Sequence, residues 1–300
     1  MDNNLTYFQK FRLELLWYSC RFFAILPYHF RYYVVENIIF TILYLMRYRM
    51  AVVKENLRNS FPDKSEKELR KIRHDSYWTL AEIFVDTISM AGLNGEGRRV
   101  INITNLEEHR EKVIGTDWIA MAAHFGCWEY YSFWGAFEPS QMLVAVYHPM
   151  SNPVFEAFYR RLRTNDYSTT VSMNNCLRYY VKNGGGKLDG KNIVMGLISD
   201  QNAPLRPDSH WFRFLNQDTL FFDGGAKLAL RYKLPTFFIK MERSRRGRYD
   251  LTFDMIYDGK EELEVNELIE RYVRRLETMI ENDPGLWMWS HRRWKFKKEC

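Results

Sequence analysis

The sequence is poor in cysteine and contains no recognisable pattern of metal ligands. Its four cysteines, in 300 residues, are scattered and suggest neither disulfide pairs nor a zinc site, which fits a reducing compartment. No clear cluster of His, Cys and Asp ligands calls for a metal, and we expect neither a metal nor another cofactor. The cysteines are Cys20, Cys127, Cys176 and Cys300.

Long uncharged runs are also missing, which bears on the amino-terminal region. Residues 11–49 are rich in apolar and aromatic side chains, but the longest uncharged stretch, Asn37 to Met46, has ten residues, about half of what a bilayer span requires. The region does not resemble a cleavable signal peptide, and Pro27 interrupts it. We expect residues 1–50 to form a membrane-associated helical anchor of one or two interfacial helices. A helix pair packed on the domain and a true span are the alternatives.

Charge and aromatic content indicate the kinds of partner. The net charge of +6 favours anionic partners, and nucleic acid, an anionic membrane surface and an acidic carrier protein all qualify. Aromatic residues make up 16% of the chain, which suits a lipid interface or an acyl-chain groove. Basic residues are scattered among acidic ones without a recognised nucleic-acid-binding motif, so we expect no nucleic-acid partner.

Residues 51–300 read as one α/β domain. Short apolar strands alternate with helices, and this order predicts a mostly parallel central sheet flanked by helices. The predicted strands are residues 118–123, 142–147, 169–171, 192–199, 234–241 and, as an antiparallel strand with one wet face, 249–257. The predicted helices are residues 65–90, which begin with a Ser65/Glu68 capping box, and residues 153–163, 173–183, 224–232 and 263–281.

Polar residues gather at the carboxyl ends of these strands, where open parallel sheets place their sites. His124 follows the first predicted strand and His148 the second. Asp200 with Gln201 follows another, and Arg243 comes shortly after residues 234–241. Together with Asn152, which can cap the next helix, these residues are the candidates for a site.

The spacing of His124 and Glu129 permits a catalytic pair. Five residues apart, the two side chains would lie about 140° apart on one helix and on opposite faces of one strand. They can meet if the chain turns between them, which Gly126 allows. An imidazole held by a carboxylate is the arrangement that a general base needs. The alternative is a histidine that bonds to backbone at a strand end, with Glu129 solvated.

A family resemblance favours the catalytic interpretation. Residues 124–129, His-Phe-Gly-Cys-Trp-Glu, resemble the His-x4-Glu/Asp motif of the lysophospholipid acyltransferase superfamily. More narrowly, the chain resembles the lipid A biosynthesis late acyltransferases of the lauroyl/myristoyl type. Further matches keep the family's order along most of the chain: residues 56–62, Tyr147-His148-Pro149 with Asn152-Pro153, Asp200-Gln201, residues 212–222, 224–229 and 284–295.

The resemblance implies an O-acyltransferase. It would move a fatty acyl chain from an acyl-carrier-protein or acyl-CoA thioester to a hydroxyl of a lipid A precursor. His124 would be the general base and Glu129 the residue that orients it. The substrate-binding candidates are His148, Asn152, Asp200, Gln201 and Arg243. The implied location is the cytoplasmic face of the inner membrane, held peripherally or by a single amino-terminal anchor.

Two departures and several alternatives stay open. His148 replaces an arginine of the family pattern, which leaves headgroup choice open, and Cys127 is either a packed thiol or, less simply, a nucleophile beside His124. The basic tail at residues 292–298 would meet phosphates or an acidic carrier, or pack its tryptophans at a solvated or membrane-facing end. Rival functions are acyl transfer to another lipid, such as a lysophospholipid or an amino-lipid, and a non-catalytic peripheral membrane protein of the same fold.

Overall fold

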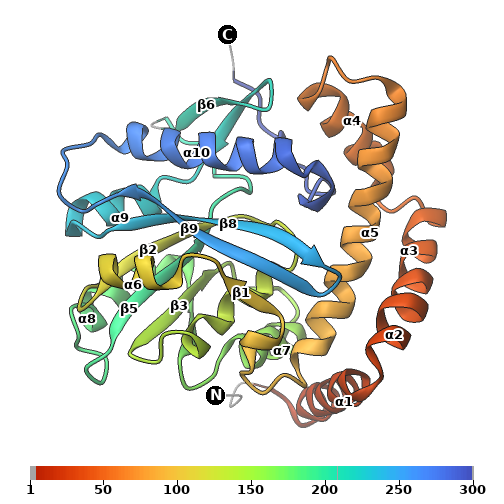
Figure 1. Ribbon diagram of the computed structural model, residues 1–300, viewed down its shortest axis with the longest axis horizontal. Coiled ribbons are helices and arrows are strands. Elements are labelled where there is room, and N and C mark those ends of the chain that lie inside the picture. Colours follow the sequence, from red (N-terminus) through yellow and green to blue (C-terminus); the bar gives the residue numbers. More distant parts are fainter. Residues whose placement is uncertain (1–4, 208, 299–300) are drawn as a thin grey trace.

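A mixed sheet of seven strands forms the centre of the computed structural model, which describes residues 5–207 and 209–298 (Figure 1). Its neighbours are parallel except β8 and β9, which are antiparallel, so the predicted mostly parallel sheet flanked by helices is confirmed. Cys300 lies outside the described residues. In spatial order the strands are β1 (Ile101–Ile103), β9 (Arg248–Tyr257), β8 (Thr236–Arg245), β2 (Trp118–Ala122), β5 (Asn192–Ile198), β3 (Gln141–Tyr147) and β4 (Ser168–Ser172).

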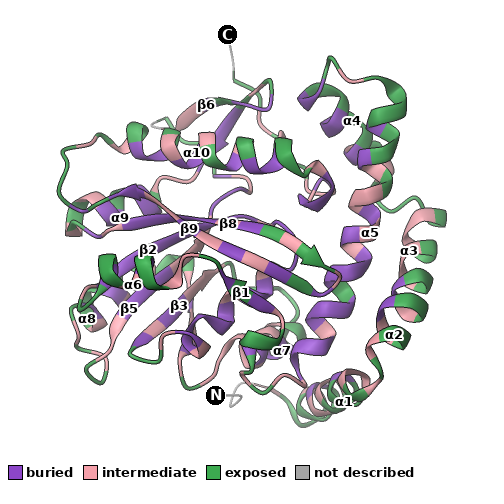
Figure 2. Ribbon diagram, viewed as in Figure 1, coloured by how far each residue is buried: buried purple, intermediate pink, exposed green. Residues whose placement is uncertain are grey.

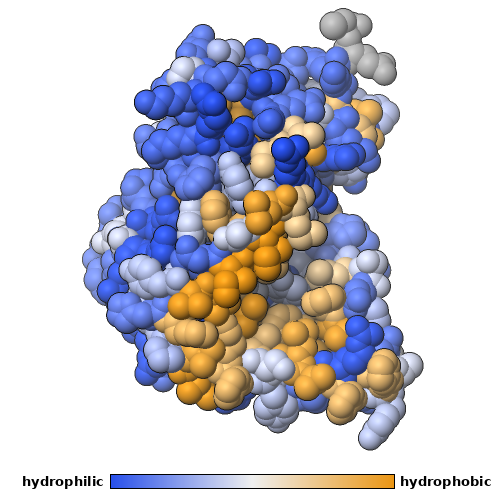
Figure 3. All heavy atoms as spheres, turned by 90° about the vertical axis from the view of Figure 1, so that its right-hand side faces the viewer, coloured by the Kyte–Doolittle hydropathy of each residue, from blue (hydrophilic) through white to orange (hydrophobic). Residues whose placement is uncertain are grey.

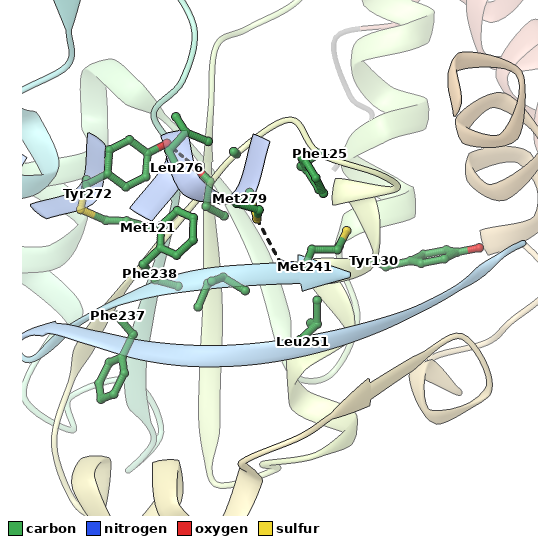
Figure 4. Packing of buried hydrophobic residues seen from close by; sticks show 14 of the residues in the cluster. Met121, Phe125, Tyr130, Phe237, Phe238, Met241, Leu251, Tyr272, Leu276 and Met279 are labelled. Atoms are coloured by element: carbon green, nitrogen blue, oxygen red, sulfur yellow. Dashed lines mark hydrogen bonds between the residues drawn. The ribbon is translucent and has the colours of Figure 1, made fainter. Parts of the chain in front are cut away.

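Helices cover both faces of this sheet. On one face lie α6 (Leu106–Val113), the 3-10 helix η3 (Trp128–Ala136) and α7 (Pro153–Arg163). On the other lie α8 (Cys176–Asn183), α9 (Gly224–Tyr232) and α10 (Val265–Asn282). Adjacent residues of β8 show the division, because Phe237 contacts His109 of α6 whereas Phe238 contacts Tyr272 of α10. Figure 4 shows the two phenylalanine rings pointing to opposite sides of the strand.

Strand β2 is uncharged because it is covered on both faces. All five of its residues are buried. Ile119 and Met121 point to the face of α9 and α10, and Trp118, Ala120 and Ala122 to the face of η3. β2 therefore lies at the centre of the domain, and the residue that follows it is held on a rigid support.

The amino-terminal helices pack along the side of this domain. They are α1 (Tyr7–Ile25), α2 (Tyr28–Phe30) with the π-helical turn η1 (Arg31–Val35), α3 (Glu36–Leu45), α4 (Met50–Ser60) and α5 (Glu66–Met90). The predicted Ser65/Glu68 capping box begins α5. α3 packs against α5, and α1 contacts both α5 and α7, so these helices form an outer layer (Figure 1). None of the helices among the described residues is long and apolar enough to cross a bilayer.

A β-hairpin lies between residues 199 and 224, where no strand was predicted. β6 (His210–Phe214) and β7 (Gln217–Phe221) pair antiparallel and contact α10. Leu215 and Asn216 connect them with positive φ angles of 46° and 62°, as a two-residue type I′ turn requires. Asn216 is a residue that favours this turn, so the sequence contained a local indication of the hairpin.

The carboxyl-terminal segment folds back into the core. After the 3-10 turn η5 (Pro284–Leu286), Trp287 and Trp289 are buried, and so is Arg293 of the basic tail. Asn56 of α4 donates hydrogen bonds to the backbone oxygens of Trp289 and His291. The structure therefore favours packing for this part of the tail.

A buried histidine next to the sheet makes stability depend on pH. His109 is 1% exposed and lies among Trp118, Trp134, Phe237 and Phe253, with ring centroids 4.3 to 5.4 Å away. Neither ring nitrogen has a hydrogen-bond partner among the described residues. Burial lowers the pKa of His109 to about 3, so the imidazole is neutral in the folded protein.

Replacing His109 with leucine should weaken this pH dependence. Below the unfolded-state pKa of about 6.5, His109 binds a proton in the unfolded chain but not in the folded protein. The free energy of unfolding therefore falls as the pH falls toward 3. The wild type should lose up to about 1.4 kcal/mol per pH unit more than His109→Leu in this range. Chemical denaturation at pH 7, 6 and 5 measures the difference, with the exposed His74→Gln as control. Equal slopes for wild type and His109→Leu would contradict the assignment.

Candidate active site

The site lies where the chain leaves two neighbouring strands in opposite directions. β2 and β5 are parallel and adjacent. The chain leaves β2 into η3 on one face, and after β5 it continues through the hairpin to α9 on the other face. Such a switch point opens a crevice at the carboxyl ends of the two strands. His124 follows β2 and Asp200 follows β5, so both side chains lie at this crevice.

The two side chains form a tight pair. His124 Nδ1 is 2.7 Å from Asp200 Oδ1, and Asp200 Oδ2 accepts hydrogen bonds from the His124 backbone N–H at 3.0 Å and from Trp287 Nε1 at 2.8 Å. Asp200 is 2% exposed. Burial raises the pKa of this carboxyl, but attraction to the imidazolium form of His124 and the hydrogen bonds from His124 and Trp287 more than offset that effect and lower the pKa. Asp200 is therefore an ionised carboxylate that accepts a hydrogen bond from the Nδ1–H of His124.

The other ring nitrogen of His124 faces the cavity. Gln201 Nε2 lies 3.1 Å from His124 Nε2. With Nδ1–H donated to Asp200, the Nε2 lone pair accepts this hydrogen bond from the Gln201 amide. The imidazole thus has the tautomer that a general base needs, with its basic nitrogen directed toward the cavity.

The prediction that Glu129 contacts the His124 ring is wrong. The chain bends at Gly126, which has a φ of 51°, but η3 then directs Glu129 toward α7. Its carboxylate oxygens accept hydrogen bonds from Arg163 Nη2 and Nε at 2.6 and 2.7 Å. A buried carboxylate gains more from this two-pronged guanidinium contact than from a single ring nitrogen. Glu129 remains beside the site, because it lines the same cavity as His124.

The remaining predicted residues divide into two groups. Gln201 contacts His124, and His148 lies exposed at the cavity edge with its Nδ1 close to the Pro149 oxygen. Asn152 caps α7, because its Oδ1 accepts from the backbone of Val154 and Phe155. Among the described residues, Asn152 is not part of the cavity lining.

Arg243 also lies away from the described cavity lining. Its guanidinium pairs with the buried carboxylate of Glu82 at 2.7 Å. Strand β8 continues to Arg245, beyond the predicted end at Met241, so Arg243 pairs with Tyr249 inside the sheet. The substrate-binding roles predicted for Asn152 and Arg243 therefore have no support from their positions.

A cavity of about 930 Å³ adjoins His124, and Asp200 lies buried behind the ring, outside the described lining. Its lining is mostly apolar and comes from both sides of the sheet, including Trp128 and Tyr131 of η3, Tyr159 of α7 and Leu228 of α9. Cys127 is fully buried, is not part of the described lining, and has a thiol pKa raised by burial. The structure thus favours packing over nucleophilic chemistry for Cys127.

Several site residues were not identified from the sequence as functional. Met288 donates its backbone N–H to the His124 oxygen at 3.2 Å, and Trp287 holds Asp200. His291 lines the cavity, and burial lowers its pKa to about 4. These tail residues lie within the segment that resembles the family ending, which was the available indication. The sequence contains no local indication of a role for Arg163, because its partner Glu129 is 34 residues away.

One comparison decides the family. The sequence model of the bacterial lipid A biosynthesis acyltransferases matches residues 4–296. The chain belongs to this family. The protein is therefore an O-acyltransferase, and its family supports acyl transfer in lipid A biosynthesis. No curated protein sequence matches the acyltransferase closely enough to count as a relative.

The orientation of the His124 ring should depend on Asp200 and not on Glu129. Asp200→Asn removes the charge that holds Nδ1–H, so the tautomer balance should change, whereas Glu129→Gln should leave it as it is. The ¹⁵N chemical shifts of the His124 ring nitrogens, measured in both variants and in the wild-type acyltransferase, report the tautomer. A change in Glu129→Gln with none in Asp200→Asn would contradict the observed geometry.

Proposed function

We propose that this acyltransferase moves a fatty acyl chain from an acyl-carrier-protein or acyl-CoA thioester to a hydroxyl of a lipid A precursor, with His124 as general base and Asp200 as its orienting carboxylate. The observation that carries the proposal is the 2.7 Å contact between His124 and Asp200 at the wall of a large apolar cavity. It joins the chemistry of a general base to a space that suits a lipid chain.

The chemical step follows from the two ring nitrogens. The acceptor hydroxyl replaces Gln201 at His124 Nε2 and gives up its proton as its oxygen attacks the thioester carbonyl carbon. The Asp200 carboxylate stabilises the imidazolium that forms. When the tetrahedral intermediate collapses, the carbon–sulfur bond breaks, and the leaving thiolate takes the proton back from His124. The products are the acylated lipid and the free thiol.

Glu129 acts on the shape of the site in this proposal. Its ion pair with Arg163 joins η3 to α7, and both residues line the cavity. Trp128 is the link to the base, because its ring packs 4.9 Å from the His124 ring and its Nε1 donates to Glu129. Removing the Glu129 charge would leave the partly buried Arg163 without its ion-pair partner and disturb the wall beside His124.

Charge at the cavity edge supports an anionic substrate. Arg206, Lys227 and Arg231 lie along this edge, and Lys227 forms an ion pair with Asp223. The thioester arm of both proposed donors ends in phosphate, and a lipid A precursor carries phosphate as well. Guanidinium groups are suited to bind such groups.

Substitution of His124 tests the proposed base. His124→Ala should lower kcat about 10²–10⁴-fold, while Glu129→Gln should lower it less, since it does not touch the ring. The measurements are the transfer rate in vitro and the mass of lipid A from cells that carry each variant, with thermal unfolding as the control for folding. Full transfer activity of His124→Ala would contradict the role of His124 as the base. An unchanged lipid A mass with another lipid altered would favour a different acceptor.

We also propose that α1 and α3 bind the cytoplasmic leaflet of the inner membrane. Large apolar residues recur every three or four positions along α1 and are exposed there, at Phe8, Phe11, Leu15, Tyr18, Phe22 and Ile25. This spacing forms one stripe, and the opposite side of α1 packs Leu13 and Cys20 into the protein. Figure 2 shows much of α1–α3 exposed, and Figure 3 shows a band of apolar side chains on the side of the molecule where they lie.

The charges next to this stripe favour an anionic bilayer. Arg12 and Arg21 lie on α1 among the exposed apolar side chains, and Arg47 and Arg49 follow α3. An interfacial helix with such a composition lies in the headgroup plane, its apolar side inserted and its arginines at lipid phosphates.

Removing apolar area from α1 should release the protein from membranes. The double variant Phe11→Ser/Phe22→Ser should bind vesicles of phosphatidylglycerol and phosphatidylcholine at least tenfold more weakly, because about 25 cal/mol is lost per Å² of apolar surface that no longer inserts. Ile114→Ser removes a similarly exposed residue outside these helices and should bind like the wild type. Vesicle flotation measures both. Equal binding of the double variant and the wild type would contradict this surface.

A further inference from the structure

The cavity has lining residues on both faces of the sheet, and the part on each face is called an arm below. From His124 the first arm runs between η3 and the face of the sheet that carries Trp118, Ala120 and Ala122. The second arm lies on the opposite face, between Leu177 of α8 and Leu228 of α9. The cavity reaches both faces because the chain leaves β2 on one side of the sheet and leaves β5 on the other.

Strand register gives the first arm a floor of small residues. Ala120 of β2 pairs with Gly196 of β5, which pairs with Ala145 of β3, and all three line the cavity. One row nearer the amino ends of the strands, the same face carries the larger Trp118, Val194 and Leu143. These side chains form a wall, so the arm runs across the strands instead of down along them.

The two ends of the first arm differ in exposure. Toward β3 the lining continues to His148 and Met150, and Met150 is 44% exposed, so this side opens to solvent. Toward β9 and β1 the lining residues are all buried. Those at the buried end are Ile101, Ile103, Trp134, Leu251 and Phe253.

The buried end carries no charge. His109 lies behind it, stacked on Phe253 at 4.3 Å, and its low pKa keeps the ring neutral. From β2 to β1 the arm crosses four adjacent strands, a distance of roughly 15 Å at the usual strand spacing. An elongated apolar space with a closed, uncharged end accepts an alkyl chain there and excludes a headgroup.

We infer that this arm holds the acyl chain that is transferred, with its methyl end against Ile101, Ile103, Trp134 and Phe253, and that this closed end sets the longest chain accepted. The inference rests on the proposed function. The thioester carbon then lies at the His124 end, where the acceptor hydroxyl arrives. The second arm has no comparable uncharged end, since Asp223, Lys227 and Arg231 line it.

Two substitutions change the arm in opposite directions. Ile103→Ala removes side-chain volume at the closed end and should admit longer chains, whereas Ala120→Leu fills the floor near His124 and should exclude them. Ile119→Ala is the matched control, because Ile119 is a buried sheet isoleucine that points to the other face and is not part of the described lining. Each of the three substitutions removes or adds three carbon atoms in the core, so all three variants should be destabilised to a similar extent.

The measurement is a ratio of rates within each variant. Saturated acyl-CoA and acyl-carrier-protein thioesters of graded length serve as donors, and kcat/KM for a donor longer than the wild-type optimum is divided by kcat/KM for the optimum. Partial unfolding cancels in this ratio. We expect it to rise about tenfold in Ile103→Ala, to fall about tenfold in Ala120→Leu and to stay within about twofold in Ile119→Ala.

The outcomes separate this inference from the proposed function. If the wild type transfers acyl chains but Ile103→Ala and Ile119→Ala give the same ratio, the chain does not lie in this arm. If the wild type transfers no acyl chain from any donor to lipid A precursor, the proposed function itself fails.

Discussion

The site depends on a single buried carboxylate. Asp200 is almost fully removed from water, and an ionised group in such a position must be paired with donors. Its three donors come from the His124 ring, the His124 backbone and the Trp287 indole, which belong to two distant parts of the chain. These contacts keep the carboxylate charged. The same contacts fix the His124 ring and hold the carboxyl-terminal segment beside the end of β2.

The surrounding fold supports this carboxylate at a place where a substrate can reach it. Parallel pairing of β2 and β5 brings His124 and Asp200 to the same edge of the sheet, and the opposite crossovers leave a crevice there. Small residues on three strands, Ala120, Gly196 and Ala145, form the floor of the cavity beside η3. α1 packs against α7, whose Tyr159 and Arg163 line the cavity, so the proposed membrane surface lies on the element next to the site.

Much of the fold could be predicted from the sequence because its central strands are uncharged and have helices over both faces. The uncharged runs at 118–123, 142–147 and 192–199 became β2, β3 and β5 almost residue for residue. The position of His124 at a strand end and the bend at Gly126 followed from the same local pattern. The β6–β7 hairpin was not predicted, because the turn is marked locally by the single residue Asn216.

The partner of the imidazole could not be predicted from local spacing. Glu129 is five residues from His124, and Asp200 is 76 residues away; which carboxylate reaches Nδ1 depends on strand order and on the direction in which η3 turns. The same holds for Arg243, which a longer β8 places in an ion pair with Glu82. Long-range pairing decided both cases, and a single sequence contains no direct record of it.

A double-mutant cycle on His124 and Asp200 tests the central claim most directly. Acyl-transfer rates are measured for His124→Ala, Asp200→Asn and the double variant, with folding checked for each. If Asp200 acts through the ring, its substitution should slow the wild type strongly and leave the His124→Ala rate about the same, because residues that act as a unit are not additive. Losses that simply multiply in the double variant would contradict the account.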